Sequence, residues 1–226
     1  MPDPVQFQWN GTLEISAPAR AVYCAGYAGR DQRSVRKHIE ELAAIGVPAP
    51  AKTPTYYRVS PLLVTTAGTI QVLGPHTSGE VEFAVFRVGG EDFVTVASDH
   101  TDREAEKTSV PLAKQLCPKV LAPAAWPVRQ VADRWDELRL RSWIGTDGGG
   151  RRLYQDATVG QLMSIDALRA ELQADAGGDP TACLLLSGTV PVVGGETVFA
   201  ARFEMELTDP ATGSSLRHAY AVEVFR

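Results

Sequence analysis

Apolar and polar residues alternate in short runs along most of this chain, and this period of two predicts β-strands more often than helices. The final two runs flank a polar loop and predict a long hairpin. The runs predicted as strands cover residues 5–16, 21–25, 55–63, 69–73, 182–186, 197–207 and 217–225.

The clearest hairpin signal lies at Gly89-Gly90, where two alternating apolar runs meet. A two-residue turn at this point places Glu80 opposite Asp99, and Glu82 shares their face because side chains two apart on a strand point the same way. A turn over residues 89–92 would instead pair Glu82 with Asp99 and leave the face unchanged. Either register gathers three carboxylates in one patch.

Helical spacing of apolar residues occurs in fewer places. One helix is expected to begin at Asp31 or Ser34, either of which can cap it, and to end at Gly46. Another begins near residues 101–104 and is interrupted by Pro111. Many strands, few helices and no regular strand–helix alternation predict a mostly-β α+β fold in one domain. Two further helices are predicted over residues 158–163 and 165–174.

Composition excludes several classes of protein. The 226 residues carry a net charge of −5 and no long basic run, so we expect neither nucleic acid nor an anionic membrane as a partner. No run of 18 apolar residues is present, and the N-terminus lacks the pattern of a signal peptide. The three cysteines are odd in number and widely spaced, which favours reduced thiols and a cytoplasmic location.

The three carboxylates of the hairpin indicate a metal site. Directly opposed side chains on paired strands lie about 5 Å apart at Cβ, so like charges there repel one another. A divalent cation that prefers oxygen ligands would offset the repulsion of Glu80, Glu82 and Asp99. The alternative is a solvated strand face that carries acidic residues without an ion.

Two other groups of residues are candidates by spacing alone. His38 and Glu41 are three apart on the first predicted helix, so they are neighbours on its surface, and a solvated helix face is the plainer interpretation. Arg103 follows closely after Asp99 and is either a structural counter-ion or a clamp for a carboxylate. His100 flanks the acidic patch, and we expect it on the surface, with a supporting position behind the carboxylates as the alternative.

Together these stretches resemble the fumarylacetoacetate hydrolase family, which includes related 2-oxo acid hydratases and decarboxylases. Glu80-Val81-Glu82 and Asp99 are similar to its metal ligands, and Ser98 to Glu104 is similar to the segment that carries a substrate-facing arginine, here Arg103. The resemblance implies a mixed β-sheet roll with a few peripheral helices, a homodimer, and a divalent cation, with Mg²⁺ expected first and Mn²⁺ or Ca²⁺ as alternatives. It divides the chain into a lid-and-strand segment over about residues 1–75 and a metal-binding core over about residues 76–226.

The resemblance also implies roles for residues outside the hairpin. His38 and Glu41 look like the water-activating pair of the family's lid, which Gly26 to Asp31 precedes. Lys114 looks like the family's active-site lysine, and Lys119 is the alternative if the register differs. In Ser187-Gly188-Thr189, Gly188 and Thr189 are similar to the loop that holds the substrate carboxylate.

The implied activity is hydrolysis of a C–C bond in a 2-oxo acid or a 1,3-dicarbonyl compound such as an acylpyruvate, through a metal-stabilised enolate. The same metal chemistry supports a lyase instead, namely a 2-oxo acid hydratase or dehydratase or an oxaloacetate-type decarboxylase. A third alternative is a non-catalytic ligand-binding member of the fold. In each case the expected partner is a small anionic molecule.

Overall fold

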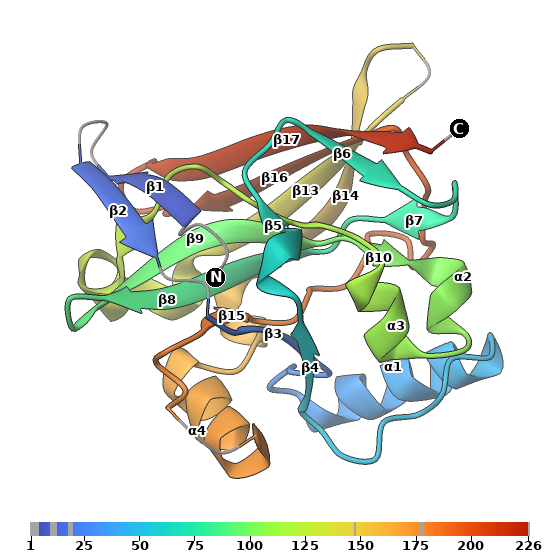
Figure 1. The fold of residues 1–226 in the computed structure, drawn as a ribbon, viewed down its shortest axis with the longest axis horizontal. Helices are drawn as coiled ribbons and strands as arrows, with labels where there is room; N and C mark the ends of the chain where they lie inside the picture. Colours follow the sequence, from blue (N-terminus) through green and yellow to red (C-terminus); the bar gives the residue numbers. More distant parts are fainter. Residues whose placement is uncertain (1–4, 10–12, 18–19, 147, 177–178, 226) are drawn as a thin grey trace.

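The computed structural model describes residues 5–9, 13–17, 20–146, 148–176 and 179–225. Within this part, the chain forms two large sheets, with short helices at the periphery (Figure 1). The fold is mostly β, as the alternating pattern predicts. None of the described helices combines the length and apolar character needed to cross a membrane.

The larger sheet has eight strands in the order β4-β3-β15-β8-β9-β11-β5, and β12 also pairs with β9. Most neighbours are antiparallel, but β15 runs parallel to β3 and β11 runs parallel to β5, so the sheet is mixed. Its strands are β3 (Val22–Gly26), β4 (Thr55–Val59), β5 (Val64–Thr65), β8 (Val81–Val88), β9 (Glu91–Asp99), β11 (Lys119–Leu121), β12 (Trp126–Pro127) and β15 (Leu184–Leu186).

The second sheet has five strands in the order β14-β13-β16-β17-β6, and it forms the upper layer in Figure 1. β16 and β17 form the long hairpin that the sequence predicts near the C-terminus. The strands are β6 (Thr69–Val72), β13 (Arg139–Gly145), β14 (Arg151–Thr158), β16 (Arg202–Thr208) and β17 (Ser215–Val224). Two small sheets complete the set, β1 (Val5–Trp9) with β2 (Leu13–Ala17) and β7 (Thr77–Ser78) with β10 (Thr101–Asp102).

The helices lie at the edges of the sheets (Figure 1). The first helix begins after Asp31, whose side chain accepts a hydrogen bond from the Arg33 N–H, as its predicted capping role requires. The helices are α1 (Gln32–Ala44), α2 (Arg103–Glu106), α3 (Val110–Gln115) and α4 (Ile165–Ala176), with 3₁₀ turns η1 (Pro61–Leu63), η2 (Val128–Gln130), η3 (Ala132–Glu137) and η4 (Val159–Gln161).

The central hairpin has the register that a two-residue turn at Gly89-Gly90 predicts. Phe86 pairs with Phe93 and Glu82 with Ala97, and both turn glycines have positive φ, at 59° and 84°. The two phenylalanine rings stack with centroids 5.7 Å apart. The register of the whole hairpin, including its acidic end, is therefore confirmed.

Alternation along β8 divides its side chains between two apolar cores. Val81, Phe83 and Val85 belong to the core between the two large sheets, together with residues such as Phe203 of β16. Ala84 and Phe86 point to the opposite face and join a second core. Glu80 and Glu82 share the face of Ala84 and Phe86, because side chains two apart on a strand point the same way. This face is turned away from the five-stranded sheet.

Some predicted elements differ from the structure. The single strand expected over residues 5–16 is instead the β1–β2 hairpin, and residues 10–12 lie outside the described part. The helix expected over residues 158–163 is only the 3₁₀ turn η4. The helix expected from residue 101 begins at Arg103, because residues 101–102 pair with β7 first. Each difference reflects strand pairing or a short turn that periodicity alone does not reveal.

Candidate metal centre

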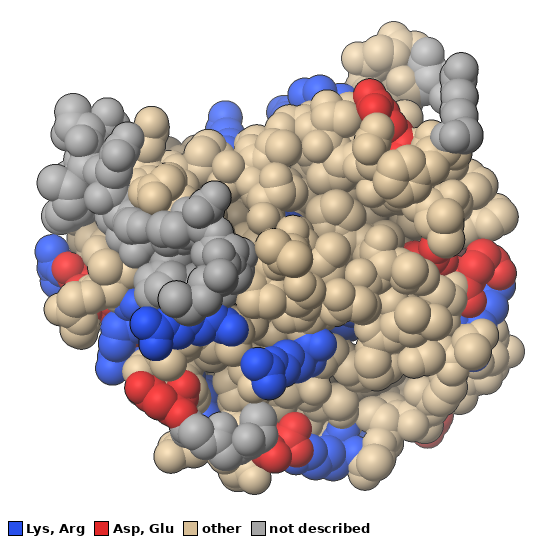
Figure 2. Space-filling view, in the orientation of Figure 1, with Lys and Arg blue, Asp and Glu red and all other residues tan. Residues whose placement is uncertain are grey.

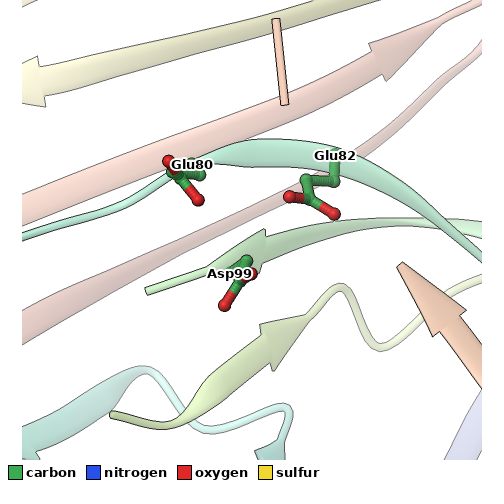
Figure 3. Close-up of side chains that lie close together, drawn as sticks. All are labelled: Glu80, Glu82 and Asp99. Carbon is green, nitrogen blue, oxygen red and sulfur yellow. The ribbon is translucent and has the colours of Figure 1, made fainter. Parts of the chain in front are cut away.

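The end of the central hairpin brings Glu80, Glu82 and Asp99 together (Figure 3). Glu80 immediately precedes β8, Glu82 lies within it, and Asp99 ends β9. The Asp99 N–H donates to the Glu80 carbonyl at 3.0 Å, which continues the strand pairing to the acidic end. One carboxylate oxygen from each residue lies within 4.8 Å of the others.

These carboxylates are not on a solvated face. Glu82 is 1% exposed and Asp99 is fully buried, and the side chain of Glu80 is 17% exposed. The interpretation of the cluster as an exposed acidic strand face is therefore wrong. Buried carboxylates need partners, because the removal of an ionised carboxylate from water is strongly unfavourable.

Three cationic side chains provide such partners. Arg103 Nη2 lies 3.0 Å from Glu80 Oε1, and Lys119 Nζ lies 2.7 Å from Asp99 Oδ1. Lys114 Nζ contacts Asp99 Oδ2 and lies 3.4 Å from Glu80 Oε2. Lys114 and Lys119, the two alternatives for the active-site lysine, therefore both contact the carboxylate cluster.

Arg103 is held by more than Glu80. Its Nε donates to Ser78 Oγ at 2.7 Å, and its Nη1 donates to Glu106 Oε2 at 2.9 Å. Its guanidinium pKa is raised, since the nearby carboxylates of Glu80 and Glu106 outweigh the opposing effect of burial. Glu106 was not identified from the sequence, although its position three residues after Arg103 on a helix is a signal for such a pair.

The three carboxylates differ in their electrostatic environment. Burial opposes ionisation of Asp99, but the charges of Lys114 and Lys119 hold its pKa below the ordinary value. The pKa of Glu80 is also lowered, because Arg103 and Lys114 outweigh burial. Burial and the charge of Asp99 raise the pKa of Glu82 well above its usual range. Glu82 is therefore the carboxylate whose charge is least compensated.

The loop after β15 contacts the cluster from the side of Glu82. The Gly188 N–H donates to Glu82 Oε2 at 2.9 Å, and Gly188 has a φ of +83°. The Thr189 hydroxyl donates to the Val81 carbonyl at 2.9 Å and accepts from Gln155 Nε2 at 2.7 Å. Both residues thus contact the chain itself, and their predicted contact with a substrate carboxylate stays a prediction.

A buried hydrogen-bond network lies on the other face of β9, behind the carboxylates. Tyr220 of β17 places its hydroxyl 2.8 Å from Ser98 Oγ and 3.0 Å from His100 Nδ1, while His100 Nε2 lies 2.9 Å from Thr77 Oγ1. His100 is 1% exposed, so the expectation of a surface histidine is wrong. Burial lowers its pKa to about 3, and the charges of Lys119 and Arg103 act in the same direction.

Two tyrosines near the cluster were missed by sequence reasoning. The ring of Tyr57 on β4 lies 5.7 Å from Lys114 Nζ. Tyr27 follows β3 with a φ of +58°, which is uncommon for a residue with a side chain. Burial raises the pKa of Tyr27 to about 12, with Tyr57 and Glu106 acting in the same direction. A single tyrosine in a strand or turn carries no periodic signal that would identify it.

His38 and Glu41 lie on α1, with exposed side chains. His38 Nδ1 is 3.9 Å from Glu41 Oε2, and the rings of His38 and Tyr27 are 6.3 Å apart. The two residues are neighbours, as their spacing predicts. Their catalytic pairing stays a prediction.

The donor set fits a hard divalent cation. Carboxylate oxygens are the preferred ligands of Mg²⁺ and Ca²⁺, and oxygens from Glu80, Glu82 and Asp99 are close enough to share one ion. Among the ion pairs of the described residues, none joins Glu82 to a cationic side chain, so a divalent ion would supply the positive charge that this carboxylate lacks.

Solved structures with similar folds were found. A crystal structure of Cg1458 with an inhibitor has 18% identity and a TM-score of 0.67, and the match covers 96% of this chain and 82% of that chain. Two structures of 2-keto-3-deoxyarabinonate dehydratase are 17% identical, each covering 97% of this chain and 79% of that chain. Their TM-scores are 0.68 for a hexagonal crystal form and 0.64 for a complex with magnesium and 2,5-dioxopentanoate. At these identities the matches show that this chain shares its fold with the two proteins.

The sequence comparisons give a family but no curated relative. No protein of curated function matches the chain in sequence. Residues 25–220, which include all of the carboxylates and cations described above, match the family described as "Protein of unknown function (DUF2848)". This chain therefore belongs to the DUF2848 family.

Proposed function

We propose that this protein is a metal-dependent lyase that removes water from a hydroxylated 2-oxo acid. The observation that carries the proposal is the buried group of Glu80, Glu82 and Asp99, with oxygens within 4.8 Å of one another and cationic side chains around them. The similarity in fold to a 2-keto-3-deoxyarabinonate dehydratase, one structure of which is complexed with magnesium, supports the same chemistry.

Glu80, Glu82 and Asp99 would hold the divalent ion, for which Mg²⁺ is the first candidate. When bound, such an ion supplies Lewis acidity that stabilises negative charge on the oxygens of a 2-oxo acid. Lys119 and the Gly188 N–H keep Asp99 and Glu82 in place, so the carboxylates need little rearrangement.

Arg103 is the residue best placed to bind the anionic end of the substrate. Its guanidinium is fixed by Ser78 and Glu106 beside Glu80, which gives it a defined orientation. With Nε, Nη1 and Nη2 each engaged once, one N–H on each terminal nitrogen is left for a substrate carboxylate, which this pair would orient for reaction. Gly188 and Thr189 remain candidates for the same anchoring role from the opposite side.

Hydrolysis of a C–C bond is the second candidate. It requires a base that activates water, and His38 oriented by Glu41 is the pair available for it on α1. Dehydration does not require this pair, and for that reason we place the lyase first. Homodimer formation, a small anionic substrate and a cytoplasmic location remain part of the proposal.

The test is a substrate panel assayed with Mg²⁺ and with EDTA. Five- and six-carbon 3-deoxy-2-oxo acids should lose water in a metal-dependent manner, whereas acylpyruvates should keep their enol absorbance. Turnover of acylpyruvates, with no dehydration of the 3-deoxy-2-oxo acids, would favour the hydrolase. Loss of that turnover in His38→Ala would then identify His38 as the base that activates water. Binding of Mg²⁺ without turnover of any compound would indicate a ligand-binding protein.

The metal assignment has its own control. Mg²⁺ should raise the melting temperature of the wild-type protein but not that of Glu82→Gln, which lacks one ligand charge. The matched control is Glu40→Gln, since Glu40 lies on α1 away from the hairpin and is exposed. An equal shift in Glu82→Gln and wild type would contradict the ligand set.

A further inference from the structure

Lys114 occupies a distinct position among the cations of the site. Its Nζ contacts Asp99 Oδ2 and lies 3.4 Å from Glu80 Oε2, so it bridges two of the three proposed ligands. Among the ion pairs of the described residues, Arg103 reaches only Glu80 of these three, and Lys119 reaches only Asp99. The side chain of Lys114 is 6% exposed, so its ammonium is part of the buried cluster.

Each carboxylate oxygen of Glu80 and Asp99 already faces a cationic side chain, and Lys114 faces one oxygen of each residue. An ion that binds among these oxygens would be repelled by Lys114, which contacts both carboxylates, and a buried site screens such repulsion weakly. Removal of Lys114 from its partners would in turn leave a buried ammonium without compensation. The binding of an ion and the position of Lys114 are therefore coupled.

The geometry points to Lys114 as a tethered cation that competes with the divalent ion for Glu80 and Asp99. In the metal-free protein it holds these two carboxylates together, and it must withdraw before the ion takes their oxygens. The inference rests on the proposed function, since it presumes that the three carboxylates bind an ion. Lys114, which the family resemblance implies to be the active-site lysine, would thus set the affinity and exchange of the metal.

Tyr57 gives the displaced ammonium another favourable position. Its ring centroid lies 5.7 Å from Lys114 Nζ, within the range in which an aromatic face attracts a cation. The side chain of Lys114 is long and comes from the short helix α3, so a small rotation changes the balance between the carboxylates and the ring. Lys119 lacks this freedom, because it also donates to the His100 carbonyl at 2.7 Å.

The experiment is a calorimetric titration of the EDTA-treated full chain with MgCl₂ and MnCl₂. Lys114→Met should bind both ions about tenfold or more tightly than wild type, since it removes a competing charge beside the ligands. Lys114→Arg keeps that charge and should bind no more tightly than wild type. Lys107→Met is the matched control, because Lys107 is an exposed lysine that pairs with Glu104, and its affinity should equal that of wild type.

The outcomes separate this inference from the proposed function. Equal affinity in wild type and Lys114→Met leaves the metal site standing and overturns the role of Lys114. Binding of Mg²⁺ or Mn²⁺ by Lys114→Met, with none detected in wild type or Lys114→Arg, supports competition between Lys114 and the ion. Failure of every variant to bind either ion overturns the metal site and, with it, both proposals.

A second comparison covers the case in which Lys114→Met does not fold without an ion. Tyr57→Leu removes the alternative position for the ammonium and should weaken ion binding severalfold, whereas Tyr57→Phe keeps the ring and should not. In a Lys114→Gln background, Tyr57→Leu should have no effect on the affinity. The same weakening in both backgrounds would show that Tyr57 acts on the site without Lys114, and the inference would fail.

Discussion

Lys119 on β11 lies directly opposite Asp99 on β9, and its Nζ is 2.7 Å from Asp99 Oδ1. Both side chains are fully buried. The pair joins the end of the central hairpin to the next strand of the eight-stranded sheet. Lys114 and this lysine together lower the pKa of Asp99 although burial opposes its charge.

Lys119→Met should therefore destabilise the protein by about 3–5 kcal/mol, the range expected when one partner of a buried ion pair is removed. Urea unfolding followed by circular dichroism measures the change in the free energy of unfolding. Lys107→Met changes an exposed lysine and should alter it by less than about 0.5 kcal/mol. A similar small change in Lys119→Met would mean that the pair contributes little to stability.

The carboxylates should respond in opposite ways to the loss of charge. Burial and the charge of Asp99 raise the pKa of Glu82, so its negative charge is unfavourable in the fold, and Glu82→Gln should keep or raise the melting temperature at pH 7 without metal. Lys114 and Lys119 lower the pKa of Asp99 despite its burial, so Asp99→Asn should lower that temperature by several degrees. Differential scanning calorimetry in EDTA measures both melting temperatures. A lower melting temperature for Glu82→Gln than for Asp99→Asn would contradict the pKa shifts described for the two carboxylates.

Tyr220 should be important for stability although it lies on the other large sheet. Its buried hydroxyl contacts both Ser98 and His100, so Tyr220→Phe leaves two buried polar groups with one partner fewer and should cost about 1–3 kcal/mol. Tyr154→Phe is the control, because within the described part of the chain the hydroxyl of this buried tyrosine accepts a single, longer hydrogen bond, 3.3 Å, from the Val198 N–H. Equal losses in the two variants would argue against a special role for the network.

The ion pairs of Asp92 predict a pH dependence. Burial opposes its ionisation, but hydrogen bonds from Arg87 and Arg169 lower its pKa from 3.8 to about 2. Because the folded pKa lies below the unfolded one, the stabilisation is complete above about pH 4 and is lost as the pH falls toward 2. After allowance for solvent screening, we expect about 1 kcal/mol.

Asp92→Asn should thus be less stable than wild type at pH 6, and the difference between the two should narrow below about pH 4. Urea unfolding between pH 6 and pH 3 measures it. The matched control is Asp133→Asn, which removes an exposed aspartate and should show no such trend. A difference that stayed constant down to pH 3 would exclude the ionisation of Asp92 as its source.

The hairpin and its acidic end could be predicted because their signals are local. A glycine pair fixes the turn, and alternation fixes the face on which Glu80 and Glu82 lie. The partners of these carboxylates could not be derived in this way. Lys114 and Lys119 were connected with the site only through the family resemblance, because lysines in short polar segments are usually exposed.

Tertiary pairing explains the remaining misses. His100 is buried because β17, more than 100 residues later in the chain, brings Tyr220 against it. The weak alternation over residues 5–16 predicts one strand where β1 and β2 pair, although Asn10-Gly11 between two alternating runs is a recognised hairpin signal. Arg103 was expected near the carboxylates and is there, but its orientation by Ser78 depends on the pairing of β7 with β10.

The two-residue turn at Gly89-Gly90 determines which side chains meet at the far end of the hairpin. If one residue were added within β9, the segment that follows it would reverse its faces, and Asp99 would point toward the five-stranded sheet instead of toward Glu82. If two were added, the faces would be restored with Asp99 displaced along the strand. An insertion in this hairpin can therefore keep the three carboxylates on one face only if it adds an even number of residues.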